Sequence, residues 1–192
     1  MYSVSCHKWT NVRSKSLDEI ERTHTAVEGI GRGRRYATQQ INRAYAVLLA
    51  AHFQGYCRDL HSECLDHLVS SLIPTMIQPI VRAEFDLNRQ LKAKNAQKGS
   101  IGSDFNRLGI SFWKEVEAHN LAKSAHIALL AEMNEWRNAI VHEDYDPTKL
   151  GGTTTLQLTK VKKWRKACNK LARSFDAVMR QYVQSLIGSS PW

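Results

Sequence analysis

Residues 36–72 carry the pattern that most constrains how this chain can fold. Apolar side chains recur there at every third or fourth position, apart from one adjacent pair, which is the spacing of a single face of an α-helix. No proline interrupts the run, and Pro74 follows its end, so one unbroken helix is predicted at the centre of the fold. The apolar positions are Tyr45, Leu48, Leu49, Phe53, Tyr56, Leu60, Cys64, Leu68 and Leu72.

The rest of the chain shows helical periodicity in shorter stretches. Ser16 and Glu19 have the spacing of a helix-starting capping box, and a glycine-rich stretch at 29–33 ends that helix. Residues 92–102 and 144–158 are polar and contain glycine, so both are predicted as loops. The further predicted helices cover residues 16–27, 75–90, 103–117, 121–141 and 159–187. We therefore expect an all-α fold, a bundle of five to six helices with one long central helix.

The chain of 192 residues is long enough to bury one core, so a single domain is expected. We place this domain at residues 16–188, with residues 1–15 as a flexible N-terminal extension and residues 189–192 as a C-terminal tail. No apolar run reaches the roughly 20 residues of a membrane span, and the N-terminus lacks the apolar core of a secretory signal. A cytoplasmic location is the resulting expectation. The cysteines form no CxxC pair and are interpreted as reduced thiols: Cys6, Cys57, Cys64 and Cys168.

The charge of the chain is positive and clustered. Lysine and arginine number 27 against 18 acidic residues, which is a net charge of +9. A basic surface favours a polyanionic partner, of which RNA is the commonest, and a solvated face that aids solubility would have the same composition. The side chains predicted to contact RNA are Lys160, Lys162, Lys163, Arg165, Lys166, Arg34 and Arg35.

The segment 135–145 brings together residue types that can do chemistry. It places Arg137, Asn138 and His142 at the polar end of an apolar helix. Asn138 and His142 are four residues apart and share one helical face. Arg137 lies five residues before His142, about 140° around the helix axis. One helix therefore offers an incomplete cleft, and a second copy across a two-fold axis would complete it.

These side chains suit the cleavage of RNA. The RNA 2′-hydroxyl attacks the adjacent phosphate once a base removes its proton, and histidine matches that task near neutral pH. An arginine fork can stabilise the charge that gathers on the phosphate, and Asn138 can orient the imidazole or a phosphate oxygen, with no metal required. Plainer explanations are also open. His142 suits the negative end of a helix dipole, and Arg137 can pair with a glutamate at position 132 or 135.

No metal site is predicted from the sequence. Two cysteines and two histidines recur within residues 57–67, but one straight helix cannot point four ligands at a tetrahedral zinc ion. Trp136 adjoins Arg137 and is equally compatible with shaping the site or the dimer interface.

The Arg-Asn-x3-His motif at Arg137 to His142, late in a helical domain, resembles the signature of the HEPN superfamily. The predicted long helix, notably residues 42–60, is similar to the matching helix of RiboL-PSP-like and related HEPN branches. The resemblance covers about residues 36–185, nearly the whole chain. It implies a helical bundle that dimerises and needs no cofactor.

The resemblance also implies an activity. Many HEPN domains are metal-independent endoribonucleases of toxin–antitoxin or phage-defence systems, so RNA, a second copy of the chain and an antitoxin or other defence protein are the implied partners. The resemblance assigns catalysis to Arg137 and His142, with Asn138 in support. The alternative is a non-catalytic HEPN module that binds RNA, nucleotide or a partner protein.

Two positions depart from the family pattern. Gln54 stands where relatives often carry an acidic residue. Tyr145 follows His142 by three positions rather than two, so the tyrosine modification known from some HEPN toxins is not predicted.

Overall fold

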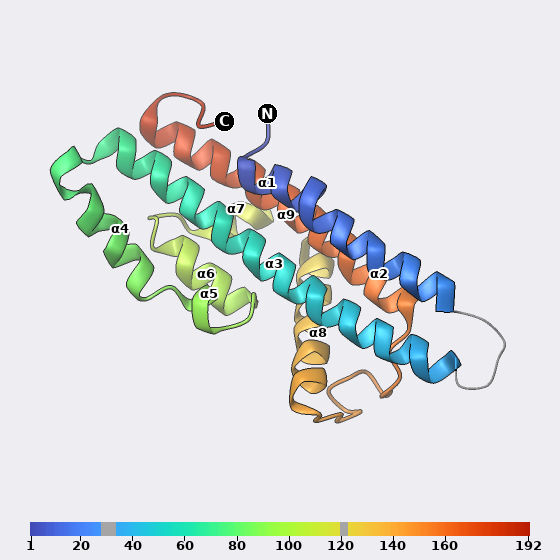
Figure 1. The fold of residues 1–192 in the computed structure, drawn as a ribbon. Coiled ribbons are helices and arrows are strands. Elements are labelled where there is room, and N and C mark those ends of the chain that lie inside the picture. The colour runs from blue at the N-terminus through green and yellow to red at the C-terminus, as the bar shows by residue number, and fades with distance from the viewer. Residues whose placement is uncertain (28–33, 120–122) are drawn as a thin grey trace.

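The computed structural model describes residues 1–27, 34–119 and 123–192, and over these ranges the chain is helical with no strand (Figure 1). The expected all-α class is confirmed. The described helices outnumber the five to six expected, because short helices form where loops or one continuous helix are predicted. They are α1 (Val4–Lys8), the π-helix η1 (Trp9–Arg13), α2 (Ser14–Val27), α3 (Arg34–Leu72), the 3-10 helix η2 (Thr75–Ile77), α4 (Gln78–Leu87), α5 (Gln90–Ala93), α6 (Lys98–Asn106), α7 (Phe112–His119), α8 (Lys123–His142) and α9 (Leu158–Ile187).

The long helix α3 is the central element, as its apolar stripe predicts. It packs against α9, α2, α8 and α1, and Figure 1 shows α2 and α9 running beside it while α8 crosses it. Phe53 of α3 is fully buried, with its ring 5.6 Å from that of Trp9 and 6.1 Å from that of Phe175. The end of the stripe departs from expectation, because Leu72 is 52% exposed at the last residue of α3.

The first fifteen residues belong to the domain, which corrects the expectation of a flexible extension. Ser3 starts α1 by accepting a hydrogen bond from Cys6 N at 3.0 Å, and its own amide donates to the Asp176 carboxylate at 3.1 Å. Trp9 is 2% exposed and donates from Nε1 to Asn169 Oδ1 at 3.0 Å. Arg13 then pairs with Asp59 of α3 at 2.9 Å. The segment is short and mostly polar, and what orders it is contact with α3 and α9 rather than its own helical pattern.

The end of the chain also packs back onto the domain rather than forming a free tail. The ring of Trp192 lies 5.7 Å from that of His67, a residue of α3, and Trp192 is partly buried against the core. Aromatic contact with α3 therefore orders residues that lie beyond α9.

The predicted loop at 92–102 is largely helical. The Asp104 carboxylate accepts hydrogen bonds from Gln90 N at 2.7 Å and Leu91 N at 2.8 Å, which caps the start of α5. Leu91 and Ile101 are fully buried, so the segment forms part of the core. The helix predicted at 103–117 is instead two helices, α6 and α7, separated by a turn in which Gly109 has a φ of 91°.

The helix α8 and the segment after it form as predicted. Glu143 adopts a left-handed φ of 54°, and Asp144 N donates to Ala139 O at 3.0 Å, a helix-ending arrangement that stops α8 at His142. Residues 143–157 contain no helix, and Leu150 and Leu156 anchor them in the core. The helix boundary therefore places His142 at the start of a loop that packs onto the bundle.

No described helix is both long enough and apolar enough to cross a membrane.

Candidate active site at the end of α8

Asn138 connects two parts of the predicted site through hydrogen bonds to its side chain. Its Oδ1 accepts hydrogen bonds from Arg137 Nη1 at 3.2 Å and from Asn95 Nδ2 at 2.7 Å. Asn95 belongs to the segment between α5 and α6, which comes close to α8 only in the folded chain. The guanidinium of Arg137 and the segment around Asn95 are thus both bonded to one amide oxygen.

Asn138 and His142 line the same hollow, as their spacing of four residues predicts. The hollow encloses about 260 Å³, and its other lining residues include Glu135, Asp144 and Lys149. His142 is exposed at the end of α8, so its imidazole is open to a ligand from solvent. Arg137 is not among the lining residues, and it contacts this group through its hydrogen bond to Asn138.

Arg137 has no acidic partner in the described part of the chain. Its candidate partner Glu132 is engaged elsewhere, because that carboxylate pairs with Lys160 and accepts a hydrogen bond from Trp164 Nε1 at 2.8 Å. Glu135 is exposed and lines the hollow. The guanidinium therefore keeps most of its five N–H donors for a ligand.

The basic residues of α9 divide into two groups. Lys160 pairs with Glu132, Lys162 with Glu21 at 3.0 Å, and Arg165 bonds Asp18 at 2.6 Å and Glu21 at 2.9 Å. These contacts tie α9 to α8 and α2.

Lys163 and Lys166 are exposed and form no ion pair within residues 1–27, 34–119 and 123–192. The side chains of Arg34 and Arg35, also predicted to contact RNA, lie outside the described residues. Of the predicted RNA contacts on α9, these two lysines are the ones with free ammonium groups.

Trp136 and Gln54, the two other residues considered near the site, contribute to the packing of helices. Trp136 is 1% exposed and its ring lies 6.3 Å from that of Trp164, so it packs between α8 and α9. Gln54 donates from Nε2 to the carbonyl of Leu91 at 2.8 Å and holds α5 against α3. Gln54 therefore supports the segment that carries Asn95 rather than lining the hollow itself.

None of the histidines of α3 is among the residues that line the hollow. Burial, followed by the charge of Arg13, lowers the pKa of His52. His61 is fully buried, donates to the Asp104 carbonyl at 3.1 Å and accepts from Arg89 Nη2 at 3.0 Å. Within the described residues, no group of three histidine, cysteine, aspartate or glutamate side chains could hold a metal ion.

The segment after His142 is fixed by a contact that the sequence pattern does not predict. The guanidinium of Arg43 on α3 lies 4.4 Å from the ring centroid of Tyr145. Such a cation–π contact ties the segment that follows α8 to α3.

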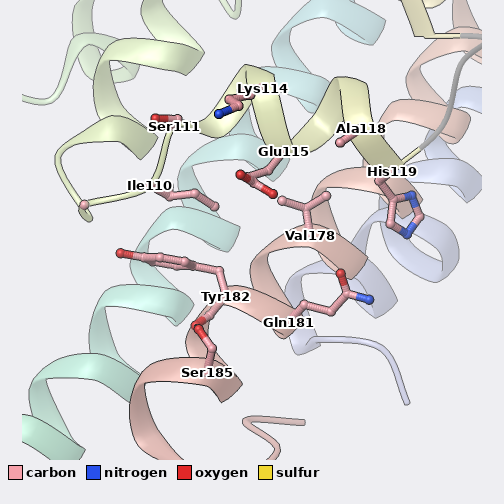
Figure 2. A pocket seen from close by; sticks show the side chains of 11 residues that line it. Ile110, Ser111, Lys114, Glu115, Ala118, His119, Val178, Gln181, Tyr182 and Ser185 are labelled. Atoms are coloured by element: carbon pink, nitrogen blue, oxygen red, sulfur yellow. The ribbon is translucent and has the colours of Figure 1, made fainter.

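A larger hollow of about 550 Å³ lies between α7 and α9 (Figure 2). It contains Lys114, Glu115 and His119, and Tyr182 forms one side by donating from its hydroxyl to Leu108 O at 2.7 Å. Figure 2 shows Glu115 pointing between the two helices toward Val178. None of the predicted catalytic residues lines this hollow.

Asn95 is the residue that sequence reasoning missed. It stands in a segment interpreted as an exposed loop, and no spacing rule links it to Asn138, which is 43 residues away in the sequence. The only signal would have been its residue type, because an amide is suited to bonding a second amide.

Comparison with known proteins agrees with the helical architecture. The profile of the RiboL-PSP-HEPN family matches residues 11–181. Comparisons with curated proteins and with solved structures find no significant match. The match spans most of the described helices, from η1 into α9. This chain belongs to the RiboL-PSP-HEPN family.

Proposed function

We propose that this protein is a metal-independent endoribonuclease that cleaves RNA at a site composed of Arg137, Asn138 and His142 from two copies of the chain. The observation that carries the proposal is the open hollow at the end of α8, where an exposed His142 stands beside Asn138 and the guanidinium of Arg137 is bonded to that asparagine without an acidic partner in the described residues. HEPN domains are frequently ribonucleases, which favours this chemistry.

The proposed reaction uses the RNA itself as the nucleophile. His142 removes the proton of a 2′-hydroxyl, the 2′-oxygen bonds to phosphorus, and the bond from phosphorus to the 5′-oxygen breaks. A proton passes to the departing 5′-oxygen, which leaves a 2′,3′-cyclic phosphate and a 5′-hydroxyl. Arg137 and the Asn138 amide stabilise the negative charge on the phosphate oxygens during the attack.

The geometry of one chain favours a shared site. Asn138 and His142 line the hollow, whereas Arg137 starts about 100° around the helix axis from Asn138 and does not line it. A two-fold axis next to α8 would bring the Arg137 of one copy toward the His142 of the other, because such an interface repeats the same patch on both partners. We propose that this homodimer is a toxin or phage-defence effector that acts on RNA in the cytoplasm.

One observation favours the second candidate, a non-catalytic module. Glu135 and Asp144 both line the hollow, and two carboxylates there would repel a phosphate. In this alternative the hollow takes a basic segment of a partner protein, and RNA binds elsewhere without being cut.

Cleavage of a labelled RNA in the presence of a chelator tests the proposal. Arg137→Ala and His142→Ala should each lower the rate at least about 100-fold in a folded protein. His119→Ala is the matched control, because His119 is likewise an exposed histidine at the last residue of a helix. Full activity of both site variants would refute the assignment, and RNA binding without fragments in the wild type would favour the module.

Mixing the two inactive variants tests whether the site is shared. If Arg137 and His142 act from different copies, a heterodimer of Arg137→Ala and His142→Ala contains one intact site and regains up to about half of the activity. If both residues act within one copy, each site of the heterodimer lacks one of them and the mixture stays inactive.

A further inference from the structure

We propose that Asn95 is a positioning residue for the site, acting through Asn138; this inference rests on the ribonuclease function proposed above. Asn95 Nδ2 donates to Asn138 Oδ1 at 2.7 Å, the shortest of the contacts that Asn138 makes through its side chain. The family motif does not extend to Asn95, which lies between α5 and α6.

The two bonds to Asn138 decide which way its amide faces. Oδ1 accepts from Asn95 and from Arg137, so both acceptor positions of that oxygen are used. The oxygen and nitrogen of a planar carboxamide lie on either side of the Cβ–Cγ bond axis. The two Nδ2–H donors of Asn138 therefore point away from these two partners. Asn138 lines the hollow beside His142, and its donors are thus available to a phosphate oxygen there.

Without Asn95, the orientation of this amide would be only weakly determined. Arg137 Nη1 reaches Oδ1 at 3.2 Å, a longer contact made by a flexible side chain that must also meet the substrate. A rotated amide would present Oδ1 to the phosphate, and two acceptors facing each other repel. Asn95 therefore determines whether Asn138 presents its N–H donors or its oxygen to RNA in the hollow. Asn95 is not itself among the lining residues.

The segment that carries Asn95 is held by hydrogen bonds from two helices, α3 and α8. Gln54 of α3 donates to the carbonyl of Leu91, and Asn134 of α8 donates from Nδ2 to the carbonyl of Ala96 at 3.1 Å. Leu91 and Ala96 are themselves buried, with 0% and 2% of their surfaces exposed. Asn95 stands between two anchored residues, so its side chain has a defined reach toward Asn138.

This arrangement also explains the amide at position 54. A carboxylate there has no proton to donate to the Leu91 carbonyl at neutral pH and would face it as a second acceptor. Gln54 thus belongs to the same set of contacts, from α3 through the Asn95 segment to α8.

Kinetics on single and double variants test the proposal. Asn95→Ala and the nearly isosteric Asn95→Asp should each lower kcat about tenfold with little change in KM, because the lost contact matters most for the developing charge. In an Asn138→Ala background, Asn95→Ala should cause no further loss, since its effect passes through Asn138. Gln97→Ala is the control, because this exposed residue lies two positions away. Equal loss in both backgrounds would overturn the proposal.

A readout without catalysis separates this inference from the proposed function. The side-chain amide resonances of Asn138, assigned by their loss in Asn138→Ala, should shift and broaden in Asn95→Asp and stay in place in Gln97→Ala. If the wild type cuts no RNA, the ribonuclease proposal fails while the resonances still report on the contact. Unchanged resonances in a folded Asn95→Asp protein would overturn the positioning role even if RNA is cleaved.

Discussion

The indole of Trp164 on α9 donates to the carboxylate of Glu132 on α8 across 2.8 Å, and Lys160 pairs with the same carboxylate. Glu132 therefore joins the helix that carries the site to the helix that carries the basic cluster. Because its oxygens are engaged there, they do not neutralise Arg137, which lies on the same helix. One carboxylate thus contributes to the packing of α8 and leaves the guanidinium available to a phosphate.

Glu132→Ala should destabilise the protein by about 1–3 kcal/mol, because it leaves the buried indole N–H of Trp164 without an acceptor. Urea unfolding followed by tryptophan fluorescence measures the change. Glu135→Ala is the matched control, since Glu135 is exposed on the same helix and should change the free energy of unfolding by less than about 0.5 kcal/mol. Equal stability of the two variants would contradict the role given to Glu132.

Arg137→Lys should retain stability but lose about 10- to 100-fold in the rate of RNA cleavage. Lysine keeps the positive charge, yet it cannot present the paired N–H donors that match two phosphate oxygens. Single-turnover cleavage rates provide the measurement, with Arg58→Lys as a control at an exposed position of α3. A Lys variant as fast as the wild type would show that charge alone suffices and that the fork is not used.

The double variant Lys163→Ala/Lys166→Ala should weaken RNA binding and reduce the salt dependence of the affinity by about two in log–log slope, because each free lysine neutralises about one phosphate. The measurement is fluorescence anisotropy with an uncleavable RNA over a range of salt concentrations. An unchanged slope would remove this face of α9 from the RNA-binding surface.

Arg165→Ala should affect stability instead. The Arg165 side chain is only 14% exposed, and its guanidinium bonds Asp18, Glu21 and Tyr45. Removing the arginine from this partly buried network should cost about 1–3 kcal/mol, visible as a lower urea midpoint. A wild-type midpoint would mean that these contacts contribute little to the docking of α2 on α9.

His61 should make the protein less stable in acid. Burial, and after it the positive charge of Arg89, lowers the pKa of His61 to about 4. The unfolded chain, with a histidine pKa of about 6.5, then binds more protons than the native state between these two values. The contribution of neutral His61 is complete above about pH 6.5 and is lost as the pH falls through about 4, a change of up to about 3 kcal/mol.

Free energies of unfolding from pH 7 to pH 4, compared between the wild type and His61→Gln, check this expectation. Glutamine offers a donor and an acceptor like neutral histidine but does not titrate, so the variant should show a flatter pH dependence. The carboxylates near His61, including Asp86, titrate in both proteins and cancel in the comparison. Parallel curves for the two proteins would argue against titration of His61.

Trp9→Ala should lower stability by about 3–5 kcal/mol, the usual cost of removing a large buried aromatic side chain. The ring of Trp9 contacts Phe53 and Tyr56 of α3. Val12→Ala, at a residue 62% exposed on the same π-helix, is the control and should stay within about 0.5 kcal/mol. If the two variants unfold at the same urea concentration, the N-terminal segment does not contribute to the core as its burial indicates.

Residue spacing alone predicts the long helices and part of the site. Helical periodicity is a local property, so the stripe of residues 36–72 predicts α3 nearly to its ends, and the same reasoning places α8 and α9. Asn138 and His142 line one hollow because residues four apart meet on any helix. These features needed no knowledge of distant neighbours.

The long-range contacts of individual side chains could not be predicted from residue spacing and depend on how the helices pack. Trp9 became a core residue, Glu132 paired with Lys160 rather than Arg137, and Asn95 reached Asn138 across 43 positions of sequence. The physical reason is the same in all three cases. Each contact joins elements that are far apart in the chain, so it produces no periodicity in the local sequence. The motif on α8 could therefore be predicted from residue spacing, while the contacts that orient it depend on the packing of α3, α9 and the Asn95 segment around it.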